Sequence, residues 1–134
     1  MSKPETSMWD SLRPVMKSLH PERIESHIKG GIPDVNYNHG WLELKYAERW
    51  PPRGGPLRVD HFTREQRSWL TERRKAGGRA FLMLKVGKSE WLLFDGLVAA
   101  AMLGRVKQDK LYEICMARWT RLPKREEICP CLIK

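Results

Sequence analysis

The sequence has little of what defines several common classes of protein. It holds three cysteines in 134 residues, at positions 115, 129 and 131, too few and too late for a disulfide framework. A zinc site would need at least one more ligand, and Cys129 and Cys131 are separated by one residue where zinc ligands usually have about two to four. We therefore expect reduced or buried free thiols.

Long hydrophobic runs and targeting signals are also missing. No stretch approaches the roughly 18 apolar residues that cross a membrane, and no signal-peptide pattern opens the chain, so we expect a protein of the cytoplasm, bacterial or of a viral host. We find no internal repeat, glycine-rich phosphate cradle or low-complexity segment. The four histidines, His61 among them, are scattered and indicate turn or surface positions. The length suits one domain spanning residues 1–134.

Negative charge is scarce relative to positive charge. Lys and Arg total 25 against 16 acidic residues, which gives a formal net charge of +9 and a pI near 9.8. Such an excess favours polyanionic partners, nucleic acid first, and says little about the fold.

What the sequence does contain is a hairpin pattern over residues 32–46. Val35 and Tyr37 alternate with polar neighbours, and Leu42 and Leu44 do the same after an Asn-His-Gly turn. This alternation is the period of a half-buried strand, and the turn residues are those of a hairpin.

The register of this hairpin brings charged side chains together. An even-length loop sets Val35 opposite Leu42 and Asp34 opposite Glu43. An odd-length loop would mix polar and apolar side chains on one face, which a core rejects. The Cβ atoms of the two carboxylates then lie about 5 Å apart. Lys45 follows Glu43 on the same face, roughly 6.6 Å along the strand.

Two opposed carboxylates destabilise a sheet unless something compensates their charge. A hard divalent cation would do so, since two carboxylate oxygens, a backbone carbonyl such as that of Leu44, and waters suit Mg²⁺. Such a metal lowers the pKa of a bound water, and Lys45 would orient that water or stabilise developing charge. The alternative is an exposed polar face on which Lys45 neutralises Glu43 diagonally.

Pro33-Asp34 followed by Glu43-Leu44-Lys45 resembles the PD-(D/E)XK signature of the restriction-endonuclease-like nuclease superfamily. The Gly-Gly-Ile-Pro-Asp approach and the later Gln66 are similar to archaeal-type Holliday junction resolvases and virus-type replication-repair nuclease domains. The resemblance covers roughly residues 22–95. It implies an α/β fold with a central mixed sheet of about five strands flanked by helices. It also implies that Asp34 and Glu43 bind Mg²⁺ or Mn²⁺ and that Lys45 is catalytic.

The same resemblance implies a third acidic ligand near the start of the chain. Asp10, on a helix that we expect over 7–19, is one candidate. The other is Glu25, which we prefer because Ile24 and Ile28 indicate a core-facing segment next to the hairpin. Spacing forces neither placement, and an ordinary surface glutamate is the alternative for Glu25.

The hairpin is followed by a proline- and glycine-rich stretch at 50–56 that can be neither helix nor central strand. Arg49, Arg53 and Arg58 lie in or beside it. We expect a loop that clamps phosphates across the scissile bond. A solvated connector is the alternative.

Thr63 and Gln66 have the spacing of a capping box and open the next helix, which Gly-Gly ends at 77–78. Gln66 has two candidate roles: the cap, which is complete without any ligand, and the contact with substrate or bound water that the resemblance implies. Arg67 and Arg74 belong to the most basic element of the chain, a candidate phosphate track or a solvated basic face.

The remainder of the chain is dominated by apolar runs. We expect strands at 80–86 and 90–94, a short helix at 97–103, an amphipathic helix at 111–119 and an irregular tail beyond Pro123.

On physical grounds alone, the sequence predicts a basic nucleic-acid-binding protein with a metal site. The resemblance implies a metal-dependent endonuclease that hydrolyses DNA phosphodiesters, with branched or junction DNA as its substrate. Because a junction has paired scissile strands, we expect a symmetric homodimer. The alternatives are a nicking or flap nuclease of replication, repair or phage DNA processing, and a DNA-binding module without catalysis.

Overall fold

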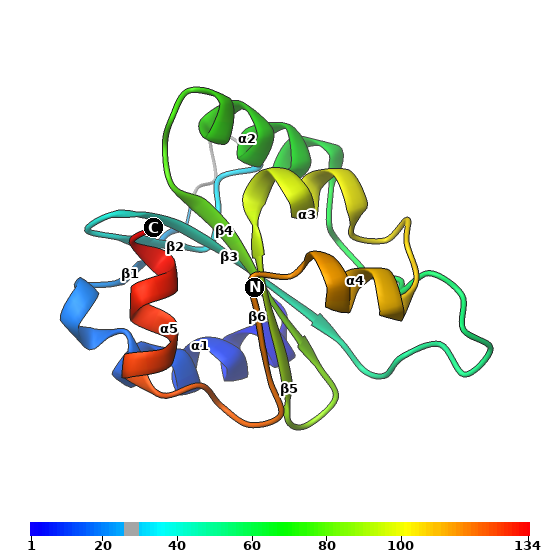
Figure 1. The fold of residues 1–134 in the computed structure, drawn as a ribbon. Coiled ribbons are helices and arrows are strands. Elements are labelled where there is room, and N and C mark those ends of the chain that lie inside the picture. The colour runs from blue at the N-terminus through cyan, green and yellow to red at the C-terminus, as the bar shows by residue number, and fades with distance from the viewer. Residues whose placement is uncertain (26–29) are drawn as a thin grey trace.

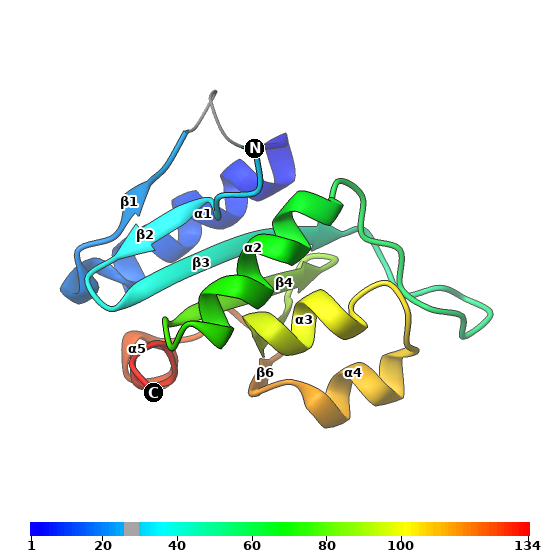
Figure 2. The same cartoon turned by 90° about the horizontal axis from the view of Figure 1, so that it is seen from above.

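The computed structural model describes residues 1–25 and 30–134 and shows three layers (Figure 1). A mixed sheet lies in the middle, with α1 and α5 on one face and α2, α3 and α4 on the other (Figure 2). The helices are α1 (Lys3–Val15), α2 (Arg64–Lys75), α3 (Gly96–Met102), α4 (Gln108–Ile114), α5 (Arg125–Leu132) and the 3-10 helix η1 (Lys17–Leu19). The strands are β1 (Glu22–Arg23), β2 (Val35–Tyr37), β3 (Gly40–Ala47), β4 (Ala80–Val86), β5 (Glu90–Asp95) and β6 (Ala117–Trp119).

In the described part of the chain the sheet has six strands, one more than expected, in the order β1-β2-β3-β4-β5-β6. Neighbouring strands are antiparallel except β3 and β4, which are parallel and connected through α2. A parallel pair requires such a crossover, whereas the antiparallel pairs need only turns. The α/β fold with a mixed sheet and flanking helices is as predicted.

The hairpin has the even-length register that the sequence predicts. Val35 lies opposite Leu42, and Tyr37 lies opposite Gly40. Both Val35 and Leu42 are fully buried against α1 and α5. The Tyr37 hydroxyl donates to the carbonyl of Leu132 in α5 at 2.6 Å, and burial raises the pKa of this phenol. The hairpin is therefore held in place by both helices of this layer.

Each face of the sheet has its own hydrophobic core. Met8 and Leu12 of α1 are completely buried on one face, and Leu70 of α2 and Ala99 of α3 are buried on the other. Strand β4 contributes to both cores along its length, as its continuous apolar run predicts. The sheet is thus covered on both sides by apolar helical surfaces.

The expected bounds of the first helix were wrong. Helix α1 begins at Lys3, with Ser2 as its N-cap and Glu5 completing a capping box, whereas Ser7 lies inside the helix. Pro14 lies in the last turn of the helix, which ends one residue later; it has no N–H to donate to the carbonyl four residues before it. The Ser-x-x-Glu spacing at 2–5 was a stronger start signal than Ser7.

The C-terminal prediction was also wrong in part. Helix α4 ends at Ile114, and β6 pairs with β5 where the sequence had suggested continued helix. Pairing with β6 satisfies backbone groups that β5 would otherwise expose at the edge of the sheet. Helix α5 replaces the expected irregular tail because Ile128 and Leu132 close the core over α1, a tertiary contact that local pattern does not reveal.

No helix in the residues described is both long and apolar enough to cross a membrane.

Candidate functional site

Alternation along β3 sends its charged side chains to the α2 side of the sheet. Leu42 and Leu44 point into the core under α1, so Glu43 and Lys45 enter the opposite layer. They are not on an exposed polar face, because their side chains are only 1% and 3% exposed. The surface alternative for this pair was therefore wrong, although Lys45 Nζ does lie 3.3 Å from Glu43 Oε2.

At the point where β2 stops pairing with β3, hydrogen bonds from backbone N–H groups to the side chains of Asp34 and Glu43 take the place of bonds between the two backbones. The backbone N–H of Asp34 donates to Glu43 Oε1 at 3.1 Å. In return, the backbone N–H of Leu44 donates to Asp34 Oδ2 at 2.9 Å. This exchange fixes the two carboxylates beside each other, as the register predicts.

Glu43 is a buried acid with fewer hydrogen-bond donors around it than its two carboxylate oxygens can accept from. Its Oε2 atom accepts no hydrogen bond from the described residues, despite the nearby Lys45 ammonium. Burial raises the pKa of the Glu43 carboxyl well above its usual range, and the negative charge of Asp34 raises it further, while Lys45 opposes both. Without a bound cation, the Glu43 carboxyl therefore holds its proton more tightly than an exposed glutamate does.

Lys45 is held by the segment that leads into α2. Its ammonium donates to the backbone carbonyl of His61 at 3.1 Å and lies 5.7 Å from the centre of the Phe62 ring. The lysine thus points along the sheet surface toward Glu43 rather than out to solvent.

The oxygen donors of this site fit a hard divalent cation. Asp34 is half-buried and offers a second carboxylate oxygen, and the orphaned Oε2 of Glu43 is adjacent. Oxygen ligands from carboxylates are those that Mg²⁺ and Mn²⁺ prefer. The described residues bring no group of three His, Cys, Asp or Glu side chains together, so a third acidic ligand is not assembled here.

Both candidates for that third acid lie on the surface. Glu25 is exposed and forms an ion pair with Arg23 at 2.9 Å, and Asp10 is exposed in a groove that Lys17 also lines. The Ile28 part of the argument for Glu25 falls outside the described residues. Glu5, which the sequence reasoning missed, is a buried acid in the first turn of α1, and the Ser2-x-x-Glu5 box was the signal for it.

Gln66 lies where the first turn of α2 meets the approach to Asp34. Its Oε1 accepts from the backbone N–H of Thr63 at 3.0 Å, so the predicted capping box is confirmed. A Cβ added to Gly31 would come within 2.6 Å of the Glu65 carbonyl, and Gly31 has φ of +90°. Only glycine therefore permits this close packing of the Gly-Gly turn against α2.

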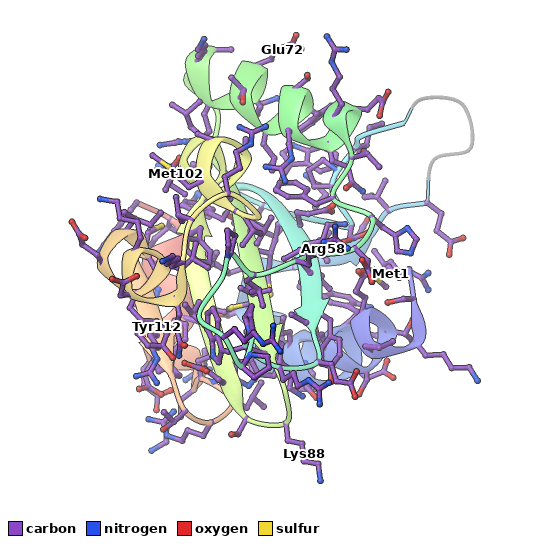
Figure 3. All side chains as sticks on the ribbon, turned by 90° about the vertical axis from the view of Figure 1, so that its right-hand side faces the viewer. Met1, Arg58, Glu72, Lys88, Met102 and Tyr112 are labelled. Atoms are coloured by element: carbon purple, nitrogen blue, oxygen red, sulfur yellow. The ribbon has the colours of Figure 1, made fainter. Side chains whose placement is uncertain are left out.

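The five candidate DNA-binding arginines fall into two groups. Arg49, Arg53 and Arg58 are exposed on the loop between β3 and α2, which extends away from the sheet (Figure 1). Figure 3 shows Arg58 where this loop returns toward α2. By contrast, Arg67 donates to the carbonyls of Ala100 and Leu103, and Arg74 pairs with Asp95 at 2.8 Å.

The base of the loop is anchored by a second acidic cluster that the sequence reasoning also missed. The indole of Trp50 donates to Glu90 at 2.7 Å, and Tyr112 and Arg118 donate to the other oxygen of the same carboxylate. Although burial alone would raise the pKa of Glu90, these three hydrogen bonds lower it. Because Glu90 and its three partners come from four separate segments, no local pattern marks this cluster.

No protein-family model and no curated protein matches the sequence. Among solved structures, the chain is similar to Hjc, a Holliday junction resolvase from the archaeal hyperthermophile Archaeoglobus fulgidus. The TM-score is 0.58 at 19% sequence identity, and the match covers 99% of this chain and 98% of that one. At this identity the likeness establishes the fold, which is restriction-endonuclease-like.

Proposed function

We propose that this chain is a divalent-metal-dependent endonuclease that hydrolyses DNA phosphodiesters, with branched DNA as its substrate. The observation that carries the proposal is the buried Glu43 carboxylate, which lies beside the carboxylate of Asp34. Its Oε2 accepts no hydrogen bond from the described residues, and the Lys45 ammonium lies 3.3 Å away. A fold gains nothing from leaving a buried oxygen unsatisfied, whereas a cation would satisfy it.

In this proposal, Asp34 and Glu43 hold Mg²⁺ or Mn²⁺, and the backbone carbonyl of Leu44 is a further ligand. When bound, the cation supplies an activated water and neutralises charge on the phosphoryl group. Asp34 is oriented by the Leu44 N–H, and Glu43 by the Asp34 N–H, so both carboxylates are fixed before any ligand arrives.

Lys45 is the proposed catalytic cation. Its ammonium is fixed by the His61 carbonyl and lies beside Glu43, so its remaining donor can reach a phosphate oxygen or the attacking water. Gln66 is proposed to help from α2. Its cap uses Oε1, and its amide nitrogen is the part that would donate to substrate or water.

The third acidic ligand has three candidates in this proposal. Glu25 is favoured by its place in the chain just before the hairpin, and Asp10 is the other candidate from sequence. Glu5 adds a buried carboxylate on α1, which packs against β3. Single replacements by Gln or Asn, read out as Mn²⁺ affinity, identify the ligand as the residue whose loss weakens binding.

We assign phosphate contacts to the arginine-bearing loop and to α2. Arg49, Arg53 and Arg58 are exposed and have charge available for a polyanion. Arg67 and Arg74 are proposed contacts as well, in addition to their bonds within the fold. The net charge of +9 supports DNA as the partner.

Branched DNA and a homodimer are proposed because a solved structure with the same fold is a Holliday junction resolvase. A four-way junction presents two scissile strands, and two copies related by a twofold axis would engage both.

The test is cleavage of a labelled four-way junction, a flap and a plain duplex in Mg²⁺, Mn²⁺ or EDTA, by the wild type and by Asp34→Asn. We expect paired cuts near the branch point that need metal and vanish in the variant. Cleavage of the flap alone would replace the junction by a flap substrate. Tight DNA binding without cleavage in any metal would contradict catalysis and leave a DNA-binding module.

A further inference from the structure

His61 has a backbone conformation that is uncommon for residues other than glycine. Its φ is +64°, in the left-handed region, which a non-glycine residue occupies at a cost, and β-branched residues at a larger one. The carbonyl of this same residue accepts the hydrogen bond from Lys45 Nζ at 3.1 Å. The strained residue and the proposed catalytic lysine are therefore joined directly.

The neighbours of His61 hold it in this conformation. Leu57 and Phe62 are buried at 2% and 8% exposure on either side of the turn, and the Arg67 guanidinium stacks 4.2 Å from the centre of the Phe62 ring. Thr63 then begins α2 as its N-cap. Strained backbone persists where surrounding contacts over-determine it, and it concentrates at functional sites.

The side chain of His61 does not share this role. Its residue is exposed, although its carbonyl is bonded to a lysine whose side chain is 3% exposed. The contribution of His61 to the site thus comes from its main chain, and the residue types allowed there depend on backbone conformation rather than on imidazole chemistry.

We infer that His61 is a positioning residue: its left-handed backbone aims a carbonyl at Lys45 and holds the ammonium beside Glu43. A rotation of the turn out of the left-handed region would withdraw this acceptor. Lys45 would then keep Glu43 as its close partner and move away from the position required for catalysis. The inference rests on the proposed function of Lys45.

A replacement series at position 61 separates backbone from side chain. Every member lacks the imidazole, but Gly and Asn accept a left-handed backbone readily, Ala accepts it at some cost, and Val accepts it least. We expect kcat for junction cleavage to fall on the order of tenfold to a hundredfold in His61→Val. The kcat of His61→Ala should lie between those of His61→Val and wild type, and His61→Asn and His61→Gly should keep most of the wild-type kcat. KM should change little across the series, because the Lys45 contact is not a DNA-docking contact.

Two outcomes of this series overturn the inference. If the Asn and Gly variants are as slow as the Val variant, the imidazole itself acts. If the Val and Ala variants cleave like wild type, the backbone conformation is irrelevant. Thermal unfolding of each variant shows whether it is folded, and the Ala variant carries the test if the Val variant does not fold.

A second measurement does not depend on nuclease activity. Amine acetylation by acetic anhydride, followed by mass spectrometry, reports how well the Lys45 ammonium is held. We expect slow labelling of Lys45 in wild type and in the Asn and Gly variants, and faster labelling in the Ala and Val variants. Lys85, which lies over Trp91 on the opposite side of the sheet, is the internal reference.

Equal Lys45 labelling in all variants would contradict the inference. If wild type cleaves no DNA, the proposed function fails, yet the labelling pattern still decides whether His61 positions Lys45.

Discussion

Two acidic clusters in this molecule make opposite use of a carboxylate. Glu90 receives hydrogen bonds from Trp50, Tyr112 and Arg118, and they lower its pKa despite burial. Glu43 is more deeply buried and has a raised pKa, and one of its oxygens accepts no hydrogen bond within the part of the chain that the structure describes. The first arrangement ties segments together, whereas the second has the carboxylate oxygens that the proposed metal ion would use.

The largest expected effect comes from Glu43→Gln, which removes a proposed metal ligand but keeps the shape of the side chain. We expect cleavage to fall by about a thousandfold or more. The free energy of unfolding of the metal-free protein should change by no more than about 1 kcal/mol, because Gln keeps the Oε1 acceptor of the Asp34 N–H and resembles the protonated carboxyl that burial favours. Junction cleavage and urea unfolding measure the two quantities. A large loss of stability would show that Glu43 is a structural residue like Glu90.

Glu90→Ala should reverse this pattern. Trp50 and Tyr112 lose their shared acceptor, so we expect about 2 kcal/mol of destabilisation, with no large contribution from the exposed Arg118. Cleavage should fall less than tenfold, since Glu90 touches no proposed ligand or substrate. Urea unfolding gives the first value, and cleavage well below the melting temperature gives the second. A rate as low as that of Glu43→Gln would remove the distinction between the clusters.

The two clusters should also give opposite slopes of stability against pH in metal-free protein. The pKa of Glu90 is lowered from 4.5, so its stabilisation is present above that pH and is lost as pH falls through the lower, folded value. The pKa of Glu43 is raised from 4.5, so the unfolded chain releases its proton first, and stability falls as pH rises above about 4.5.

Unfolding in urea from pH 3 to 8 with EDTA measures both slopes. Glu43→Gln should abolish the fall above pH 4.5, and Glu90→Gln should weaken the fall below it. Mg²⁺ should oppose the Glu43 effect by taking the place of its proton. An unchanged profile in Glu43→Gln would mean that this carboxyl is ionised without metal.

The smallest effects belong to the loop. We expect Arg53→Ala to raise KM about threefold. The slope of log binding constant against log salt concentration should become shallower by about one. The free energy of unfolding should not change. Lys88→Ala is the matched control, because Lys88 is exposed on the β4–β5 turn, far from Glu72 in α2 (Figure 3). Equal effects of the two substitutions would indicate general charge rather than a phosphate contact.

Much of the site could be predicted because it depends on one short hairpin. The alternation of Val35 and Leu42 sets the register, and the register alone sets Asp34 beside Glu43. The burial of Lys45 could not be predicted, since it depends on the loop returning past His61, sixteen residues later. Tertiary contacts likewise decided that β6 pairs at a sheet edge and that α5 covers a core.

Arg67 shows the same limit. Its position in a basic helix indicates a phosphate track, but its guanidinium binds carbonyls near the end of α3 and after it. Charge pattern identifies which residues are basic, whereas the packing of α3 against α2 determines which of them are engaged inside the fold.

The hydrogen bond from Tyr37 to Leu132 spans 95 residues of sequence. It therefore cannot form until the last helix has been synthesised. At about 5 to 20 residues per second, the hairpin is synthesised on the order of 5 to 20 seconds before α5. During that interval α1, which is translated first, is the available cover for the apolar face under Asp34 and Glu43. Substitutions at Met8 or Leu12 should thus lower the yield of native protein in cells more than their effect on equilibrium stability would indicate.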